Sequence, residues 1–348
     1  MYDIEKYSHL LINEMIDLEA TDIHFVPVAS DFHLSYRRNG RLEQWRKLKM
    51  DVADRLISHF KYLSGMDIGE RRKPQSSSII YRTQESTYSL RLSTLPTQDK
   101  ESLAIRILPH LTSTTLLSLP VLNQARKTLI DISRTKNGLC LLSGPTGSGK
   151  STTLYAIIEQ MIKGGGKSII TIEDPIERPI PSIVQVEVNA KAGLSFDAIL
   201  RASLRHDPDV LLIGEIRDEA TAALAIRASL TGHFVLATIH ASNCYQALLR
   251  MIDLGVSRVD LSQCLKYVLS QRLVQIKCPI CGGNGCSPIC GQSQLSRAAL
   301  FDALKGEELA KVIQIGAIKH YNQFQGGAKR AWALGYLTEA ELLGVMDE

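Results

Sequence analysis

Apolar residues recur at helical spacing within residues 1–18, at Tyr7, Leu10, Leu11, Met15 and Leu18, and this pattern predicts a helix. A second helix is predicted for "ADRLISHFKYLSG", residues 53–65. Four other stretches alternate polar and apolar residues, as half-buried strands do: "DIHFVPV", "DFHLSYRRNGRLEQW", "SIIYRTQESTYSLRLSTLP" and "SLAIRILP". The Asn-Gly pair in "RNGR" predicts a tight hairpin turn. Residues 1–109 are therefore expected to form an α+β domain with an antiparallel sheet.

The pattern changes at Gly138, where an apolar strand, a glycine-rich loop, a helix and another apolar strand follow one another. This alternation is typical of an α/β domain with a parallel sheet. The polar residues 110–118 are the predicted linker, and residues 119–348 form the predicted second domain. Beyond about residue 260 the sequence predicts mostly helices, interrupted by a cysteine cluster at 278–290.

Charge and hydropathy argue against two classes of protein. The chain has 348 residues, of which 40 are basic and 36 acidic, for a net charge of +4. This surplus is too small to indicate the basic patch of a general nucleic-acid binder, so no direct contact with nucleic acid is expected. No apolar run approaches the roughly 20 residues that span a bilayer, and the amphipathic residues 1–20 do not resemble a signal peptide. The expected location is the cytoplasm, with any role at a membrane exerted through partners.

The segment "LLSGPTGSGKSTTLY", residues 141–155, matches the full spacing of a phosphate-binding P-loop. The apolar strand "GLCLLS" precedes the loop and the helix "STTLYAIIEQMI" follows it, which is the context that the motif requires. Lys150 would reach the β- and γ-phosphates, and Ser151 would bind Mg²⁺. The alternative is a chance glycine-rich turn. The predicted contacts to ATP and Mg²⁺ are Gly144, Pro145, Thr146, Gly147, Ser148, Gly149, Lys150 and Ser151.

A second acidic stretch, "SIITIEDPIE", follows an apolar run at Ile169–Ile172. Ligands of open α/β sheets bind beyond the carboxyl ends of the strands. Glu173, Asp174 and Glu177 are therefore candidates to face the metal ion or the attacking water. The alternative is an acidic surface turn, and the spacing alone does not decide between the two.

A third apolar strand, Val210–Ile213, is followed by Gly214 and Glu215. P-loop enzymes commonly carry an Asp here for Mg²⁺ and an acidic or amide side chain that orients the attacking water. Since glycine stands at the Asp position, Glu215 is the candidate general base. The next strand ends at His240, where an imidazole can sense the γ-phosphate. The alternative is a structural histidine, an interpretation that suits His233 better than His240.

These motifs together resemble those of the type II secretion and type IV pilus ATPase family. Its four core blocks, called Walker A, Asp box, Walker B and His box, are matched by "GPTGSGKSTTLY", "TIEDPIE", "LRASLRHDPDVLLIGEIRD" and "TGHFVLATIHASN". The missing Walker B Asp is usual in that family. Likeness extends to the first domain in "ATDIHFVP", "GMDIGERRKPQ" and "LRLSTLPT", and to the C-terminal part in "SQRLVQIKC" and "GYLTEAELLGV". Ser76 and Ser77 depart from the family, which usually has Asp-Gly there.

The resemblance implies an α/β fold, with a RecA-like P-loop ATPase domain preceded by a smaller, PAS-like α+β domain. It further implies a hexameric ring that works on a polytopic membrane platform protein, at the cytoplasmic face of the inner or plasma membrane. The first domain of such proteins supplies arginines to the nucleotide, and the motif match assigns Arg91 and Arg106. A guanidinium suits this role because it stabilises charge that develops on phosphoryl oxygens. The alternative is that both are surface residues of strands.

Four cysteines are clustered in "CPICGGNGCSPIC", at Cys278, Cys281, Cys286 and Cys290. Two close pairs of thiolates suit a tetrahedral Zn²⁺ site, and clustering in a reducing compartment favours a metal over disulfides. The pairs are closer in sequence than in the usual zinc ribbon, to which assembly ATPases of the family are similar. The alternative is a cluster of thiols or a disulfide in a strained loop.

The predicted function is a motor ATPase that assembles a pilus-like fibre. Among its family the chain most resembles the ATPases of Gram-positive competence systems, which also lack a long module before the "TDIHF" domain and support DNA uptake. A retraction ATPase is the first alternative, although retraction motors lack the cysteine cluster. A DNA-translocating ring ATPase is the second, and a scaffold that binds ATP without turnover is the third. Lys150 and Glu215 argue against the scaffold.

Overall fold

The computed structural model divides into two compact units, Met1–Thr112 and Ser113–Glu348. The division falls within the predicted linker. The structure describes residues 3–38, 41–84, 86–98, 100–109, 115–189, 192–278, 280–282, 290, 297–315 and 323–347.

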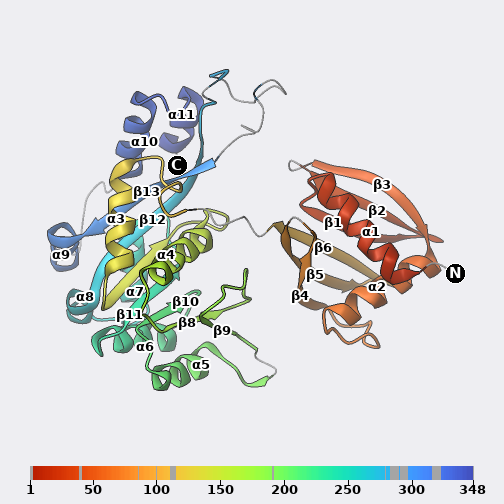
Figure 1. Ribbon diagram of the computed structural model, residues 1–348, viewed down its shortest axis with the longest axis horizontal. Coiled ribbons are helices and arrows are strands. Elements are labelled where there is room, and N and C mark those ends of the chain that lie inside the picture. Colours follow the sequence, from red (N-terminus) through yellow and green to blue (C-terminus); the bar gives the residue numbers. More distant parts are fainter. Residues whose placement is uncertain are drawn as a thin grey trace. The chain divides into compact units, whose positions relative to one another are not determined.

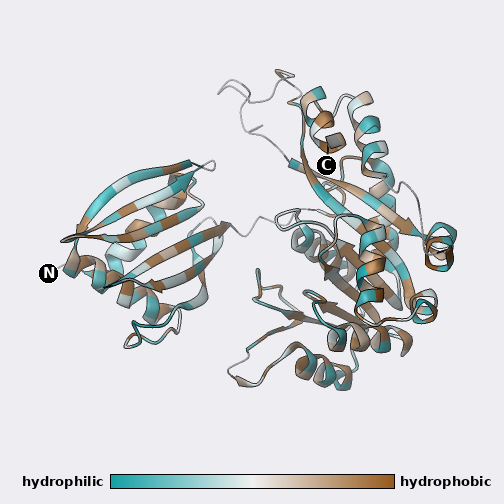
Figure 2. Ribbon diagram, turned by 180° about the vertical axis from the view of Figure 1, so that it is seen from behind, coloured by the Kyte–Doolittle hydropathy of each residue, from teal (hydrophilic) through white to brown (hydrophobic). Residues whose placement is uncertain are grey.

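The first unit is an antiparallel sheet with two helices on one face (Figure 1). The strand order is β3-β2-β1-β6-β5-β4, and brown and teal residues alternate along the strands in Figure 2. The inward-facing residues, such as Phe25, Leu90 and Ile105, pack with Leu11 and Phe60 of the helices. The predicted α+β architecture is confirmed. The elements are α1 (Ile4–Asp17), β1 (Asp22–Val28), β2 (Asp31–Arg38), β3 (Arg41–Lys49), α2 (Met50–Leu63), β4 (Gln75–Arg82), β5 (Thr87–Pro96) and β6 (Glu101–Pro109).

The hairpin predicted from "RNGR" joins β2 and β3, in which Arg38 lies opposite Arg41. Asn39 and Gly40 themselves lie outside the described residues. The pairing of the flanking residues confirms the hairpin.

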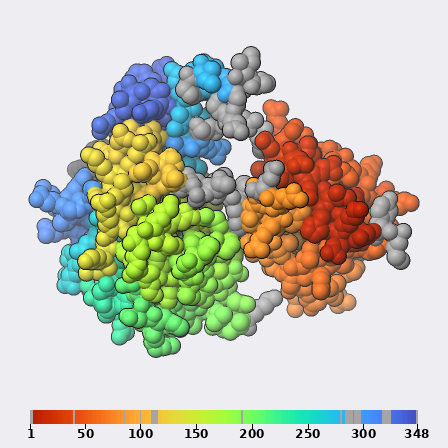
Figure 3. Space-filling view, viewed as in Figure 1, coloured from red at the N-terminus to blue at the C-terminus, as the bar shows by residue number. Residues whose placement is uncertain are grey.

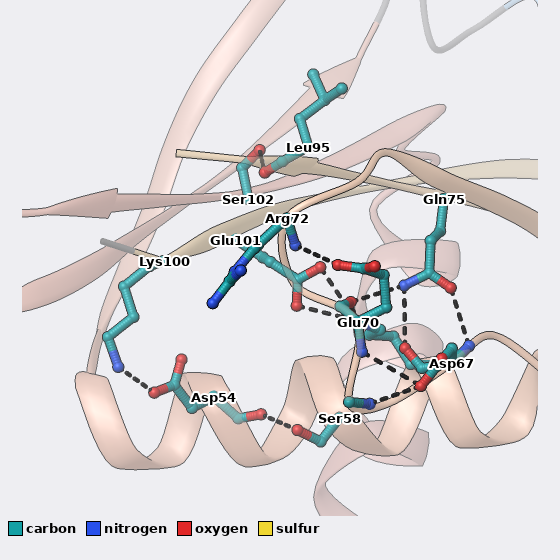
Figure 4. Close-up of polar contacts among 12 residues, drawn as sticks. Asp54, Ser58, Asp67, Glu70, Arg72, Gln75, Leu95, Lys100, Glu101 and Ser102 are labelled. Atoms are coloured by element: carbon teal, nitrogen blue, oxygen red, sulfur yellow. Dashed lines mark hydrogen bonds and ion pairs between the residues drawn. The ribbon is translucent and has the colours of Figure 1, made fainter. Parts of the chain in front are cut away.

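A buried ion pair anchors the loop between α2 and β4. Lys61 Nζ lies 3.0 Å from Glu101 Oε2, and the two side chains are only 1% and 5% exposed. The same ammonium donates to the carbonyl of Glu70 at 2.7 Å. Gln75 Nε2 donates to the carbonyls of Asp67 and Glu70 (Figure 4). The loop is therefore fixed from the helix side and from the strand side.

Lys61→Met is expected to destabilise the first unit by about 3–5 kcal/mol, because it leaves the Glu101 carboxylate buried without its partner. Lys100→Met is the matched control. It removes the more exposed ion pair of Lys100 with Asp54, which is worth about 0–1 kcal/mol. Urea unfolding followed by Trp45 fluorescence, in a Trp332→Phe background, reports the first unit alone. Equal losses in the two variants would contradict the assignment.

The second unit contains a seven-stranded sheet in the order β13-β12-β7-β11-β10-β8-β9. Every described neighbouring pair is parallel except β12 with β13. Strands β7, β8, β10 and β11 are buried along their whole length, as expected of parallel strands with helices on both faces. The strands are β7 (Gly138–Ser143), β8 (Ile169–Glu173), β9 (Val184–Glu187), β10 (Val210–Ile213), β11 (Phe234–Ile239), β12 (Leu265–Gln275) and β13 (Arg297–Lys305).

Helices cover both faces of this sheet. Alternate residues of β7 face opposite sides, with Leu139 and Leu141 in one apolar cluster and Cys140 and Leu142 in the other. Helices α3 and α4 cover the second face. The helices are α3 (Asn123–Arg134), α4 (Lys150–Gly164), α5 (Phe196–Ser203), α6 (Glu219–Leu230), α7 (Cys244–Asp253), α8 (Arg258–Cys264), α9 (Gly306–Ile315), α10 (Gln323–Ala333) and α11 (Glu339–Asp347).

Helices α8 to α11 lie in the part beyond about residue 260 that was expected to be mostly helical, but that expectation missed β12 and β13, which extend the sheet there. Strand β12 is rich in Leu and Gln, and β13 is rich in Ala and Leu; these residues favour helices when considered alone. Pairing with β7 and burial against the core outweigh that local preference. Because β13 runs antiparallel to β12, the predicted parallel sheet is a mixed one.

Candidate nucleotide-binding site

The P-loop connects β7 to α4 and is built on glycines that no other residue could replace. Gly144 has φ +146° and Gly149 has φ +85°, in the region that favours glycine. A Cβ at Gly144 would lie 2.5 Å from the carbonyl oxygen of Gln271, and one at Gly149 would lie 2.9 Å from Gln271 Nε2. The loop therefore packs against β12 at distances that only glycine allows. Pro145, Thr146 and Gly147 form its exposed tip.

Lys150 and Ser151 lie in the first turn of α4, directly after the loop. Lys150 Nζ donates to the carbonyls of Gly144 at 2.8 Å and Pro145 at 3.0 Å. Burial lowers the pKa of this ammonium, while the negative charges of Glu215 and Glu177 act in the opposite direction. The lysine predicted to bind phosphates is thus close to two of the predicted acidic residues.

Gln271 of β12 supports the loop, a role that the sequence did not predict. Its Nε2 donates to the carbonyl of Ser148 at 2.7 Å, and its Oε1 accepts from Thr153 Oγ1 at 2.8 Å. The side chain is 1% exposed. It fixes the loop to the first turns of α4. Gln271 lies in "SQRLVQIKC", a segment that resembles the family, but only the pairing of β12 with β7 brings Gln271 to the loop.

The carboxylate of Glu173, at the end of β8, is buried and accepts three hydrogen bonds. The donors are Thr171 Oγ1 at 2.6 Å, Gln185 Nε2 at 3.1 Å and the hydroxyl of Tyr155. The Tyr155 oxygen in turn accepts from the backbone N–H of Glu177 at 3.2 Å. Burial, together with the charge of Glu173, raises the pKa of Tyr155. This arrangement favours a positioning role for Glu173, which holds the 174–177 segment in place.

Glu215 is the centre of a charged cluster at the carboxyl edge of the sheet. Arg217 Nε donates to Glu215 Oε2 at 2.7 Å, and His240 Nε2 lies 3.2 Å from Glu215 Oε1. Arg217 Nη1 also lies 3.5 Å from Asp174 Oδ2. The neighbouring strands β8, β10 and β11 end at this edge, where ligands of open α/β sheets bind. The structure therefore brings together Glu215, His240 and Asp174, as expected from their positions after strands.

Arg217 links these acids, and the sequence did not single it out. The hydrogen bond to Glu215 raises the pKa of its guanidinium. Its position two residues after Glu215, in "GEIRD", was the one feature of the sequence that could have indicated this role. In this position it can hold both carboxylates apart from each other and in fixed orientations.

The absence of the Walker B Asp has a steric reason. A Cβ at Gly214 would lie 3.0 Å from the carbonyl oxygen of Ile172 on β8. The N–H of Gly214 donates to that same carbonyl at 2.8 Å, so β8 and β10 are held close at this point. A residue with a Cβ here would require the Ile172 carbonyl to shift by a few tenths of an ångström.

His233 lies at the opposite end of β11 from His240. Its Nδ1 is 3.0 Å from the carbonyl oxygen of Ala228 and 3.1 Å from Thr231 Oγ1. These contacts close the turn between α6 and β11. The structural interpretation therefore suits His233, as expected.

Arg91 and Arg106 lie directly opposite each other on β5 and β6 of the first unit. Arg106 Nε donates to Asp22 Oδ1 at 2.8 Å, and its side chain is 62% exposed. The two arginines share the sheet face that points away from the helices, since the alternate residues Leu90, Leu92 and Ile105 face the core. Their contact with a nucleotide remains a prediction.

Three of the four clustered cysteines converge. The sulfurs of Cys278, Cys281 and Cys290 all lie within 4.8 Å of one another. A Zn–S distance of about 2.3 Å in a tetrahedral site places sulfurs about 3.8 Å apart, so this donor set fits zinc after a small contraction. Cys286 lies outside the described residues.

The sequence profile of the type II/IV secretion system protein family matches residues 2–332. The competence protein ComGA of Halalkalibacterium halodurans is 42% identical over 346 residues, which cover 98% of each chain. ComGA of Bacillus subtilis is 41% identical over 344 residues, covering 97% of this chain and 96% of its own. The chain therefore belongs to the type II/IV secretion system protein family, as the motifs indicated.

A longer relative agrees with this assignment, and two solved structures share the fold. Type II secretion system protein E of Pseudomonas aeruginosa is 39% identical over 279 residues, or 80% of this chain and 55% of that protein. The pilus retraction motor PilT with bound ADP has a TM-score of 0.76 at 24% identity, covering 99% of this chain and 97% of PilT. The ATPase DotB of Legionella pneumophila has a TM-score of 0.70 at 20% identity, covering 97% and 95%. The predicted fold class, a P-loop α/β domain preceded by a smaller α+β domain, is confirmed.

No helix in the described part of the chain combines the length and the apolar character needed to cross a bilayer.

Proposed function

We propose that this protein is a motor ATPase that powers assembly of a type IV pilus-like or competence pseudopilus fibre. One observation carries the catalytic part of the proposal: Glu215 and His240 meet at the sheet edge, and the charge of Glu215 acts on Lys150 of the P-loop. The similarity to ComGA over nearly the whole chain supports the competence system. A hexameric ring, a polytopic membrane platform protein as partner, and a place at the cytoplasmic face of the membrane complete the proposal.

The geometry supports a division of labour in ATP hydrolysis. The P-loop N–H groups and Lys150 bind the phosphates, and Ser151, with Asp174 as the second candidate, would hold Mg²⁺, which supplies positive charge against the phosphate oxygens. Glu215 takes the proton of the attacking water. His240, 51% exposed and in contact with Glu215, is placed to sense the loss of the γ-phosphate. Glu177 adds negative charge near Lys150.

The test of this function is the ATPase rate of the purified full chain, with and without added DNA. The proposal predicts Mg²⁺-dependent hydrolysis of ATP that DNA does not stimulate. A several-fold stimulation by DNA would favour the DNA-translocating ring. Binding of ATP without turnover would favour the scaffold.

Arg91→Ala and Arg106→Ala should each lower the turnover number by about tenfold to a hundredfold, the value of one charge-assisted hydrogen bond, while ATP still binds. Arg82→Ala is the matched control, since Arg82 is exposed on the neighbouring strand β4. Steady-state hydrolysis and equilibrium nucleotide binding measure the two effects. Unchanged turnover in both variants would restrict the catalytic groups to the second unit.

We further propose that the cysteine cluster binds zinc, and purified protein should then contain about one Zn²⁺ per chain. Cys281→Ser should lower the melting temperature, because the metal's binding free energy contributes to folding. Cys281 is exposed, so Cys281→Ser removes little buried surface. A decrease in the melting temperature therefore reports the loss of the metal. Metal-free protein whose melting temperature is unchanged by Cys281→Ser would favour the thiol alternative.

A further inference from the structure

A groove of about 560 Å³ lies in the second unit between α3, α10 and the sheet. Its floor is apolar and consists of Leu129, Leu269, Phe301 and Ala303. Figure 3 shows α3, in yellow, next to the C-terminal helices, in dark blue. Nothing in the proposed mechanism uses this groove.

Two consecutive glycines of α10 shape one wall of the groove. A Cβ at Gly327 would lie 3.2 Å from Leu300 Cδ1, so glycine lets α10 pack closely on β13. A Cβ at Gly326 would meet no atom within 4 Å. Gly326 also lines the groove. Because Gly326 has no side chain, the space beside its Cα is part of the groove. Glycine is not needed at this position for the packing of α10.

The rim of the groove carries charges of both signs, and one of its cations has no partner among the described residues. Arg330 lines it, and its guanidinium has no hydrogen bond or ion pair to any residue that the structure describes. Lys305 lies 3.4 Å from Asp131, and both side chains are about half exposed. Glu308 also lines the groove and, with Asp131, supplies its negative charge. An apolar floor below a free guanidinium complements a ligand that has an apolar body and an anionic end.

We propose that this groove binds a small amphipathic anion, with its apolar part on Phe301 and Leu269 and its carboxylate, sulfonate or phosphate at Arg330 and Lys305. The volume falls within the roughly 300–1,000 Å³ of small-molecule sites, which are mostly apolar with a few polar groups. The occupant that this volume fits is a small molecule, such as a fatty acid or a lipid.

The groove is separate from the phosphate site but shares a strand pair with it. Leu269 of the floor lies on β12 two residues before Gln271, which supports the P-loop. Phe301 lies directly opposite Gln271 in the pairing of β12 with β13. A ligand in the groove would rest on the strands that hold the P-loop, while the phosphates bind at the strand ends.

The probe is 8-anilinonaphthalene-1-sulfonate, an aromatic amphipathic anion, titrated into the full chain saturated with Mg²⁺ and ADP. Wild-type protein should show saturable fluorescence enhancement. Gly326→Leu fills the groove and should weaken binding at least about tenfold, since a blocked site loses most of its contact area. Gly344→Leu is the matched control, because Gly344 is also helical with open space around its Cβ but lies outside the groove. No saturable binding to wild type, or equal binding to both variants, would overturn the proposal.

A second pair of variants tests the anionic end independently of the groove's shape. Arg330→Ala should weaken probe binding by about tenfold, as expected for a lost charge-assisted contact. Lys329→Ala, at an exposed neighbouring position outside the lining, should leave binding unchanged. Equal effects of the two substitutions would overturn the assignment of Arg330.

Two competitors distinguish the source of the ligand. Displacement of the probe by monomeric oleate, but not by vesicles of phosphatidylglycerol, would identify a soluble amphiphile. Displacement by the vesicles, with vesicles of phosphatidylcholine as the control, would identify a membrane lipid. Failure of all competitors to displace a probe that is sensitive to Gly326→Leu would overturn the amphipathic anion as the ligand class.

Discussion

Glu215→Gln is expected to reduce ATP hydrolysis by about 10⁴-fold, the upper range for loss of a general base, with nucleotide binding unchanged. Glutamine keeps the size of the side chain and can still form hydrogen bonds, but it cannot accept the proton of the attacking water. The carboxylate lies 2.7 Å from Arg217 Nε and 3.2 Å from His240 Nε2. Rapid-quench hydrolysis and titration with a fluorescent nucleotide measure the two quantities separately.

Glu219→Gln is the matched control for this experiment. Glu219 lies four residues further along, exposed in the first turn of α6, and its substitution should leave both quantities at the wild-type level. Hydrolysis by Glu215→Gln at the wild-type rate would show that another group activates the water. Glu177 is then the next candidate, because its charge also acts on Lys150.

Lys150→Ala is expected to weaken ATP binding by about a hundredfold, the upper value of a charge-assisted contact, and to lower the residual turnover by a further 10²–10³-fold or so. Lys163→Ala, exposed in the last turn of the same helix, is the control. Equilibrium binding and hydrolysis at saturating ATP distinguish the two losses. Wild-type affinity in Lys150→Ala would remove this lysine from the phosphate site.

The same lysine predicts a pH dependence. Because burial lowers the pKa of the Lys150 ammonium, the free protein loses this proton at a lower pH than an exposed lysine does. Only the charged form attracts phosphates, so ATP affinity should fall as the pH rises, beginning below the usual lysine range. Lys150→Ala should not show this fall.

The parallel core could be predicted from the sequence because β7, β8, β10 and β11 are short apolar runs that lead into glycine, an acidic residue or histidine. Strands β7 and β10 have the predicted bounds. Strands β12 and β13 were missed because one residue composition suits both helix and strand, and only their neighbours decide between the two. The pairing of Leu269 with Leu142 is a property of the folded sheet that no local pattern contains.

The candidate site was predicted in part for a similar reason. Lys150, Glu215 and His240 could be found because each follows a strand, and strand ends meet at one edge. Arg217, Gln271 and Tyr155 were missed because their roles depend on which side chains meet across that edge. Gln271 is far from Ser148 in the sequence, although its side chain donates to the Ser148 carbonyl. In the sequence Arg217 cannot be distinguished from other surface arginines, and only its contacts with Glu215 and Asp174 reveal its role.

The central claim is that ATP hydrolysis at Glu215 drives fibre assembly. The most direct measurement is the number of surface fibres in a strain that lacks the protein, complemented with the wild-type chain or with Glu215→Gln. The account predicts no fibres in the deletion strain, fibres restored by the wild-type chain, and none restored by Glu215→Gln. An excess of fibres in the deletion strain would identify a retraction motor, and an unchanged number of fibres would contradict a role in fibre assembly altogether.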